Sequence, residues 1–399
     1  AKANFELVAR SYTQFDVSPL TSFQPSQFSL GLNNFLSYFR LRVQPLFDFG
    51  PFKQQFIANT AEVASIFHFP GEEIQSPKVD WQKYKTAGAP AYLPTEGTFM
   101  GYNFFRGSKT PIFISPTDRR RHLYLVGQTG VGKTEVLKNM FLQDVFAGHG
   151  TCYIDPHGDA AEDLLQKIPL NRVKDVIYWN PGDFDFPLGL NIMDAKTEEQ
   201  KNIIVNSFIA LLYKLYDPNR QGLMGPMLER TVRNTMLTAM SEEGNTLVEV
   251  LRLLTNDDFA RSKIDKIKDP IIKTYWTDQM AKTTDFHKSE TLGYYISKFD
   301  RFVSDSVIRN IVGQSKSAFD FVQIMNEKKI LIVNLSKGKI GEENMSFLGM
   351  LLIPKFLTAA MERENIPEDQ REDFYLYVDE FQNFATTDFV NILSEARKF

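Results

Sequence analysis

From Arg121 onward, short apolar runs alternate with glycine-containing loops and with stretches in which apolar residues recur every three or four positions. The apolar runs, each a predicted strand, are residues 122–126, 151–154, 175–179, 329–335 and 374–378. Near-continuous apolar runs of this length are typical of parallel strands that are covered on both faces. The pattern therefore predicts an α/β core, a parallel sheet with helices on both faces.

Between Asp194 and about Met325 the periodicity is helical only. The predicted helices are residues 198–216, 226–242, 246–254, 271–280 and 290–311. Because no strand interrupts this region, we predict an all-α domain at 195–325, inserted between two parts of the core at 118–194 and 326–399.

The first part of the chain, residues 1–117, differs from the rest. It holds about half of the 19 prolines and is rich in phenylalanine without a regular period. Helical pieces are predicted at 29–40 and 60–67, and a hairpin at 98–105 and 111–115 that turns through Gly107-Ser108-Lys109. We interpret this part as an irregular N-terminal accessory domain.

Composition narrows the class of protein. At 399 residues the chain is too long for one ordinary core, and 43% hydrophobic with 24% charged residues is globular usage. A net charge of −4 does not fit a protein that coats nucleic acid with its whole surface.

The one cysteine, Cys152, lies in a predicted strand as a core residue, and the five histidines show no zinc-binding spacing. No run approaches the roughly 18 to 20 apolar residues of a membrane span, although the chain does not begin with Met and an upstream anchor stays open.

A complete phosphate-binding loop follows the first predicted strand. The motif GxxxxGK[ST] is matched by Gly127, Gln128, Thr129, Gly130, Val131, Gly132, Lys133 and Thr134. It precedes a predicted helix at 134–146, and a strand before and a helix after are the context that the motif requires. Backbone N–H groups of such a loop hold phosphates, the lysine reaches the β and γ phosphates, and the hydroxyl binds Mg²⁺. The sequence therefore predicts ATP with Mg²⁺ as cofactors.

Two carboxylates end the last predicted strand. Asp379 is placed to bind Mg²⁺ together with Thr134, and Glu380 to activate water for attack on the γ phosphate. A strand that simply ends in solvated acids is the alternative, which the phosphate loop disfavours. Asp155 ends another predicted strand, and since ligand sites gather at the carboxyl ends of parallel strands, we expect it beside the phosphate loop. His157 either contacts nucleotide or caps the next helix.

The order of these segments resembles the HerA/FtsK superfamily, and within it the TraG/TraD-type coupling proteins and related type IV secretion ATPases. Besides the phosphate loop, the resemblance rests on Tyr153-Ile154-Asp155-Pro156-His157-Gly158-Asp159, Tyr178-Trp179-Asn180-Pro181, the long α insertion, Asn334-Leu335-Ser336-Lys337-Gly338 and Val378-Asp379-Glu380-Phe381-Gln382-Asn383-Phe384. It covers roughly residues 111–399 and extends weakly through 64–70.

The resemblance implies a RecA-like motor that forms a homo-hexamer, binds ATP between subunits and threads DNA through a central channel. It also implies that Arg397 reaches the nucleotide of a neighbouring subunit, against the alternative of a helix-end arginine in solvent. In that family a further strand carries a glutamine that senses the γ phosphate; this sequence ends at Phe399, and no residue in it is assigned to this role. Implied partners are DNA, single- or double-stranded, and secretion-channel or relaxosome proteins. The implied location is the cytoplasm at the inner membrane, reached only through other segments or partners.

Basic residues that could contact DNA form two groups, Lys337 with Lys339 and the insertion lysines Lys263, Lys266 and Lys268; lysines of a solvated surface are the alternative, which is favoured. Arg119-Arg120-Arg121 before the phosphate loop could approach phosphate from outside, against the favoured alternative of a solvated loop. We therefore expect an ATP-hydrolysing DNA translocase of conjugation or type IV secretion. Two alternatives stay open: a secretion ATPase that powers pilus assembly or protein export without DNA, and a non-catalytic docking module gated by nucleotide.

Overall fold

The computed structural model describes residues 87–222, 224–280 and 285–386. The chain divides into two units, 1–85 and 86–399, and every element below belongs to the second. The helical pieces predicted at 29–40 and 60–67 lie outside the described residues, as does Arg397.

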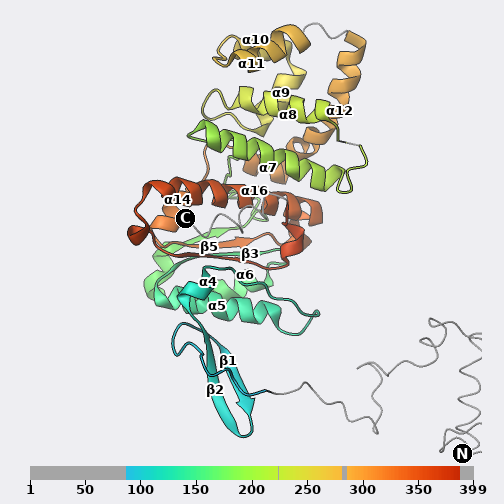
Figure 1. Ribbon diagram of the computed structural model, residues 1–399. Helices are drawn as coiled ribbons and strands as arrows, with labels where there is room; N and C mark the ends of the chain where they lie inside the picture. The colour runs from blue at the N-terminus through green and yellow to red at the C-terminus, as the bar shows by residue number, and fades with distance from the viewer. Residues whose placement is uncertain (1–86, 223, 281–284, 387–399) are drawn as a thin grey trace, which may run out of the picture. The chain divides into compact units, whose positions relative to one another are not determined.

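A four-stranded parallel sheet forms the centre of the second unit (Figure 1). Its strands are β3 (Gly150–Asp155), β4 (Val176–Trp179), β5 (Ile330–Asn334) and β6 (Phe374–Val378), in the order β4-β5-β3-β6. All four were predicted from their apolar runs, and the α/β class with a parallel sheet is confirmed. Within the described residues β6 pairs only with β3, in the register Cys152 to Leu376, so β6 is an edge strand.

The predicted strand at 122–126 is wrong. A short helix, α4 (Pro116–Arg119), ends just before it, and His122 then takes a left-handed φ of 66° that interrupts extended chain. The apolar side chains that suggested a buried strand are exposed: Tyr124 by 76% and Val126 by 82%. A cavity of about 750 Å³ separates this segment from the edge strand β6, so the segment does not pair with the sheet.

Alternation along the strands divides the core into two layers. Tyr153, Ile332 and Tyr377 face α5 (Lys133–Ala147) and α6 (Asp159–Lys167). Cys152 and Val333 face the opposite layer, which is built on α14 (Phe321–Asn326) and α16 (Glu342–Glu362). Figure 1 shows the sheet between these two pairs of helices. Helices therefore cover both faces, as predicted.

The predicted insertion contains helices joined by loops and no strand among its described residues, and its apolar side chains join the core of the α16 layer. Its helices are α7 (Glu198–Tyr216), α8 (Pro226–Ala239), α9 (Leu247–Thr255), α10 (Asp257–Ile264), α11 (Pro270–Thr274), the π-helical turn η4 (Tyr275–Met280), α12 (Asp285–Ser304) and α13 (Ser306–Val312). The predicted helix 290–311 is in fact two, because Asp305 is extended and its carboxylate caps the start of α13 through the N–H groups of Val307 and Ile308.

Shorter elements complete the unit. They are the 3₁₀ turns η3 (Leu170–Asp175), η5 (Arg363–Asn365), η6 (Glu368–Gln370) and η7 (Phe381–Asn383), and the one-turn helix α15 (Lys337–Ile340). Among the described residues, one helical stretch, Glu342–Asn365, is long and apolar enough to cross a membrane. Of its apolar window 78% is buried inside the protein, and a core helix passes the same test, so this is a weak indication of a span.

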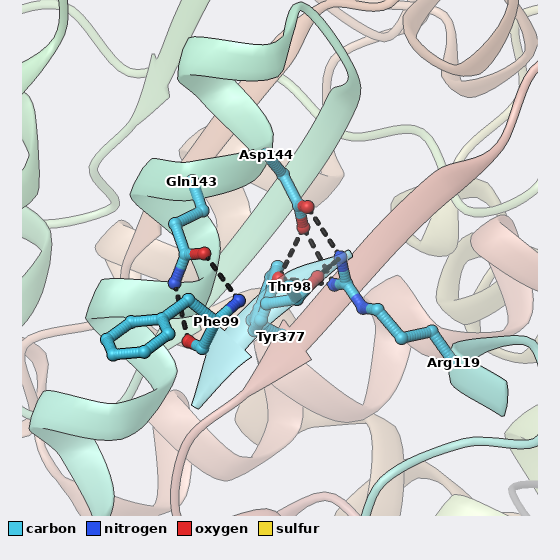
Figure 2. A network of polar contacts seen from close by, with 6 residues as sticks. All are labelled: Thr98, Phe99, Arg119, Gln143, Asp144 and Tyr377. Carbon is cyan, nitrogen blue, oxygen red and sulfur yellow. Dashed lines mark hydrogen bonds and ion pairs between the residues drawn. The ribbon is translucent and has the colours of Figure 1, made fainter. Parts of the chain in front are cut away.

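The predicted hairpin is present as β1 (Thr98–Phe105) and β2 (Ser108–Ile114). It is fastened to α5 by the side-chain amide of Gln143, which donates to the backbone oxygen of Phe99 at 2.9 Å and accepts from its N–H at 2.8 Å (Figure 2). The hairpin therefore belongs to the same unit as the sheet.

Candidate nucleotide-binding site

The phosphate loop lies between the extended segment and the first turn of α5. Gly130 and Gly132 have φ values of 84° and 97°. Residues other than glycine adopt this left-handed backbone conformation only under strain. The second of these glycines is the N-cap of α5, so the loop leads directly to the helix N-terminus. Lys133 folds over the loop, and its Nζ donates to the backbone oxygens of Gly127 and Gln128 at 2.9 and 3.0 Å.

The two acidic residues of the last strand lie next to this loop. Thr134 Oγ1 donates a 2.8 Å hydrogen bond to Asp379 Oδ2, which joins the start of α5 to the end of β6. Asp379 is only 5% exposed, and its other carboxylate oxygen accepts from the N–H of Glu380 at 2.9 Å. A hydroxyl and a carboxylate oxygen side by side are the hard ligands that Mg²⁺ takes beside phosphates. The residues present therefore fit a magnesium nucleotide.

Glu380 is held in an unusual backbone conformation. Its φ of 45° and ψ of 49° are left-handed, which costs a non-glycine residue on the order of 1 to 3 kcal/mol. Its carboxylate accepts a hydrogen bond of 2.5 Å from the side-chain amide of Gln382. The acid thus projects from a strained turn at the carboxyl end of the sheet, where water could be activated.

Asp155 lies at the same end of the sheet, but its carboxylate is hydrogen-bonded to the protein backbone. Its carboxylate accepts from the N–H groups of His157 and Ala161, both at 2.8 Å, so it orders the start of α6. Next to it in β3, the Tyr153 hydroxyl is buried and has no hydrogen-bond partner among the described residues. Burial raises the pKa of Tyr153, and the charges of Asp379 and Asp155 raise it further. This tyrosine, absent from our predicted site, therefore stays neutral beside the metal ligand.

The turn after Glu380 is anchored from two helices. Phe384 is fully buried and packs where Gly349 of α16 leaves room; a Cβ there would lie 2.2 Å from its ring. Lys214, in the last turn of α7, donates through Nζ to the backbone oxygens of Gln382, Asn383 and Ala385. No spacing in the sequence distinguishes Lys214 from the other lysines of an amphipathic helix, and sequence reasoning missed it.

A second contact missed by sequence reasoning joins the elements that carry the two motifs. The Arg119 guanidinium donates to the Asp144 carboxylate of α5, to the Tyr377 hydroxyl of β6 and to Thr98 of the hairpin (Figure 2). It also stacks 3.7 Å from the ring centre of Tyr375. Burial alone would lower the pKa of Arg119, but the contacts with Asp144 raise it. The guanidinium is therefore a permanently charged buried partner.

The prediction for the three consecutive arginines is wrong for Arg119, which neither approaches phosphate nor lies in solvent: its side chain is 7% exposed. Arg120 pairs with Asp373 on the surface, at 3.1 Å. The DNA candidates of the insertion do not form a free basic patch, because Lys263 and Lys266 both pair with Glu242. Sequence alone could not reveal these acidic partners.

The phosphate loop, the facing pair of Thr134 and Asp379, and the parallel sheet are together typical of a P-loop nucleotide-binding protein of the α/β class. The chain is 21% identical over 362 residues to type 4 coupling protein DotL of Legionella pneumophila subsp. pneumophila, a match that covers 75% of this chain and 45% of DotL. The chain thus spans about half the length of that curated relative. The sequence match is thus a distant similarity to a type IV coupling protein. No family model matches it.

Solved structures of the plasmid coupling protein TrwB show a limited likeness. The unbound form of TrwBdeltaN70 has a TM-score of 0.46 at 16% identity and covers 73% of this chain and 62% of that one. TrwB with the ATP analogue ADPNP has a TM-score of 0.48 at 16% identity, covering 71% and 63%. TrwB with ADP and Mg²⁺ has a TM-score of 0.47 at 15% identity, covering 72% and 63%. At these scores the likeness to TrwB carries no argument, and the similarity to coupling proteins rests on the sequence match alone.

Proposed function

We propose that this chain is the motor domain of a coupling-protein-like ATPase, which hydrolyses ATP with Mg²⁺ and translocates DNA in conjugation or type IV secretion. One observation carries the proposal. The hydrogen bond between Thr134 and Asp379 brings the start of α5 and the end of β6 together from distant parts of the sequence. A glycine turn without nucleotide would have no reason to face an acid of this kind.

In the proposed reaction, the loop N–H groups and Lys133 hold the β and γ phosphates. Thr134 and Asp379 would hold Mg²⁺, which would supply positive charge to offset the charge on the transferring phosphoryl group. Glu380 accepts a proton from the attacking water. Asp155 acts indirectly, because its carboxylate fixes the turn at the start of α6.

Assembly and partners belong to the same proposal. The resemblance to coupling proteins supports a homo-hexamer with nucleotide between subunits, in which Arg397 would reach the neighbour's γ phosphate. It equally supports secretion-channel or relaxosome partners and a position at the cytoplasmic face of the inner membrane. An arginine supplied in trans contributes on the order of 10³ to 10⁵ in rate in other P-loop enzymes.

The test is steady-state ATP hydrolysis with and without single- and double-stranded DNA, at low and moderate salt. Lys133→Ala removes the phosphate contact, and Glu380→Gln removes the base while keeping its size. Glu372→Gln is the matched control, because Glu372 pairs with Lys328 on the surface, near the opposite end of β6. We expect hydrolysis that rises with DNA, loses this stimulation as salt screens the phosphate contacts, and vanishes in the first two variants only.

The alternatives give different outcomes. Hydrolysis that depends on Lys133 but ignores DNA would indicate a secretion ATPase acting on pilus or protein, which the pairing of Lys263 and Lys266 with Glu242 favours. Nucleotide binding without hydrolysis in the unmodified hexamer would indicate the docking module. Unchanged turnover in Glu380→Gln would show that Glu380 is not the base.

A further inference from the structure

The turn behind the candidate base has three backbone carbonyl groups that receive no hydrogen bond from a backbone N–H of the described residues. Within η7 and the residues after it, the N–H groups of Asn383 and Ala385 donate to the backbone oxygens of Glu380 and Phe381. As at the end of any short helix, the last carbonyls receive no hydrogen bond from within the turn. Among the described residues, no backbone N–H donates to the oxygens of Gln382, Asn383 and Ala385.

A single ammonium group meets all three of these carbonyls. Lys214 Nζ lies 3.0 Å from the oxygen of Gln382, 3.2 Å from that of Asn383 and 2.6 Å from that of Ala385. Three donors on three acceptors use the full hydrogen-bonding capacity of the group. A cation beside C-terminal carbonyls also interacts favourably with their aligned dipoles. The arrangement thus fixes the turn, although burial lowers the pKa of Lys214.

From this lysine a short path leads to the base. Lys214 holds the backbone oxygen of Gln382, and the side-chain amide of Gln382 donates to the Glu380 carboxylate at 2.5 Å. Two hydrogen bonds therefore separate α7, the first helix of the insertion, from the proposed base. Because Glu380 has a strained left-handed backbone, its orientation depends on such restraints.

We propose that Lys214 is a positioning residue for ATP hydrolysis, which ties the turn behind Glu380 to α7 and so couples the all-α insertion to the base. The proposal rests on the proposed ATPase function. A partner or DNA that shifts the end of α7 would then change the rate of hydrolysis without touching the nucleotide.

The test compares Lys214→Met with Lys201→Met in the full chain with MgATP. Lys201 is on the same helix but pairs with Glu198 at 2.7 Å, away from the turn. We expect Lys214→Met to lower kcat roughly 10- to 100-fold, the range for a misplaced catalytic group, with KM within about twofold because the phosphate contacts are intact. Lys214→Arg, which keeps charged donors, restores part of kcat, and Lys201→Met retains full kcat.

Hydrogen exchange over residues 379–386 gives a readout that does not need turnover. In Lys214→Met these amides exchange at least about tenfold faster, while those in the middle of α7 keep their protection. Equal kcat in Lys214→Met and Lys201→Met would overturn the proposal. If the unmodified chain does not hydrolyse ATP, the proposed function fails, and exchange alone decides whether Lys214 anchors the turn: unchanged exchange refutes the anchor.

If Lys214→Met does not fold, Gln382→Ala replaces it, because this variant breaks the same path while leaving α7 untouched. A lower kcat with unchanged KM supports the path from Lys214 to Glu380. A kcat equal to that of the unmodified chain overturns it.

Discussion

Removing the Arg119 guanidinium should destabilise the protein far more than removing its neighbour. In Arg119→Met the Asp144 carboxylate stays behind with 4% of its side chain exposed and without its bidentate partner. Breaking a buried ion pair in this way costs about 3 to 5 kcal/mol, since the remaining charge is uncompensated. Arg120→Met breaks an ion pair whose arginine is 53% exposed, and such surface pairs are worth about 0 to 1 kcal/mol.

The assay is urea unfolding of the unmodified chain, the two single variants and the double variant Arg119→Met/Asp144→Asn. Because most of the loss comes from the unpaired charge, the double variant should recover part of it. Tyr377→Phe removes one hydroxyl from the same network and should cost about 1 to 3 kcal/mol. If Arg119→Met and Arg120→Met differ by less than about 1 kcal/mol at equal m-value, the reasoning about burial is refuted.

Three further predictions concern other parts of the unit. Gly349→Ala should lower the free energy of unfolding in urea by about 1 to 3 kcal/mol, because the added methyl group would lie 2.2 Å from the Phe384 ring. An unchanged midpoint of urea unfolding would show that the ring moves aside at no cost. Burial lowers the pKa of Lys355 from 10.5 to about 8, so the folded chain binds fewer protons between these values. Between pH 8 and 10.5 its stability should therefore rise relative to Lys355→Met, by at most roughly 3 kcal/mol, and parallel stability curves for the two proteins would contradict the shift. Thr246→Ala removes the capping box that Thr246 forms with Glu249 at the start of α9 and should cost about 1 kcal/mol, measured by thermal unfolding.

Sequence reasoning succeeded where a local pattern corresponds to one physical cause. The strands β3 and β5 are buried at every position, and their apolar runs had no competing explanation. The edge strand β6 is only half-buried, yet it begins and ends where predicted, at Phe374 and Val378. The helix 198–216 was likewise found with its predicted bounds, because Thr197 caps its start and an apolar stripe runs along it. The phosphate loop could be found without tertiary information, since its glycines are needed for the left-handed backbone of the loop itself.

The failures share a different cause. The run at 122–126 has the composition of a strand, but pairing requires direct backbone contact with a strand edge, and a cavity lies between this segment and the edge strand β6. Lys214 donates to carbonyl oxygens more than 160 positions away in the sequence. Arg119 donates to the hydroxyl of Tyr377, which is still more distant in the sequence. Charge and helical position alone could not choose between such a buried role and a solvated one.

The order of strands in the sheet has a consequence for how the chain acquires its structure. Thr151 of β3 pairs with Ile330 of β5 on one side and with Tyr375 of β6 on the other, so neither neighbour exists until most of the chain has been synthesised. The intervening helices have mainly local contacts and can form early, whereas such distant pairings close late and slowly. On the ribosome, which makes a chain from its N-terminus, β3 would emerge apolar and unpaired. The site that the phosphate loop forms with Asp379 would then be among the last parts to form. Nucleotide binding would therefore begin only after the insertion has been synthesised.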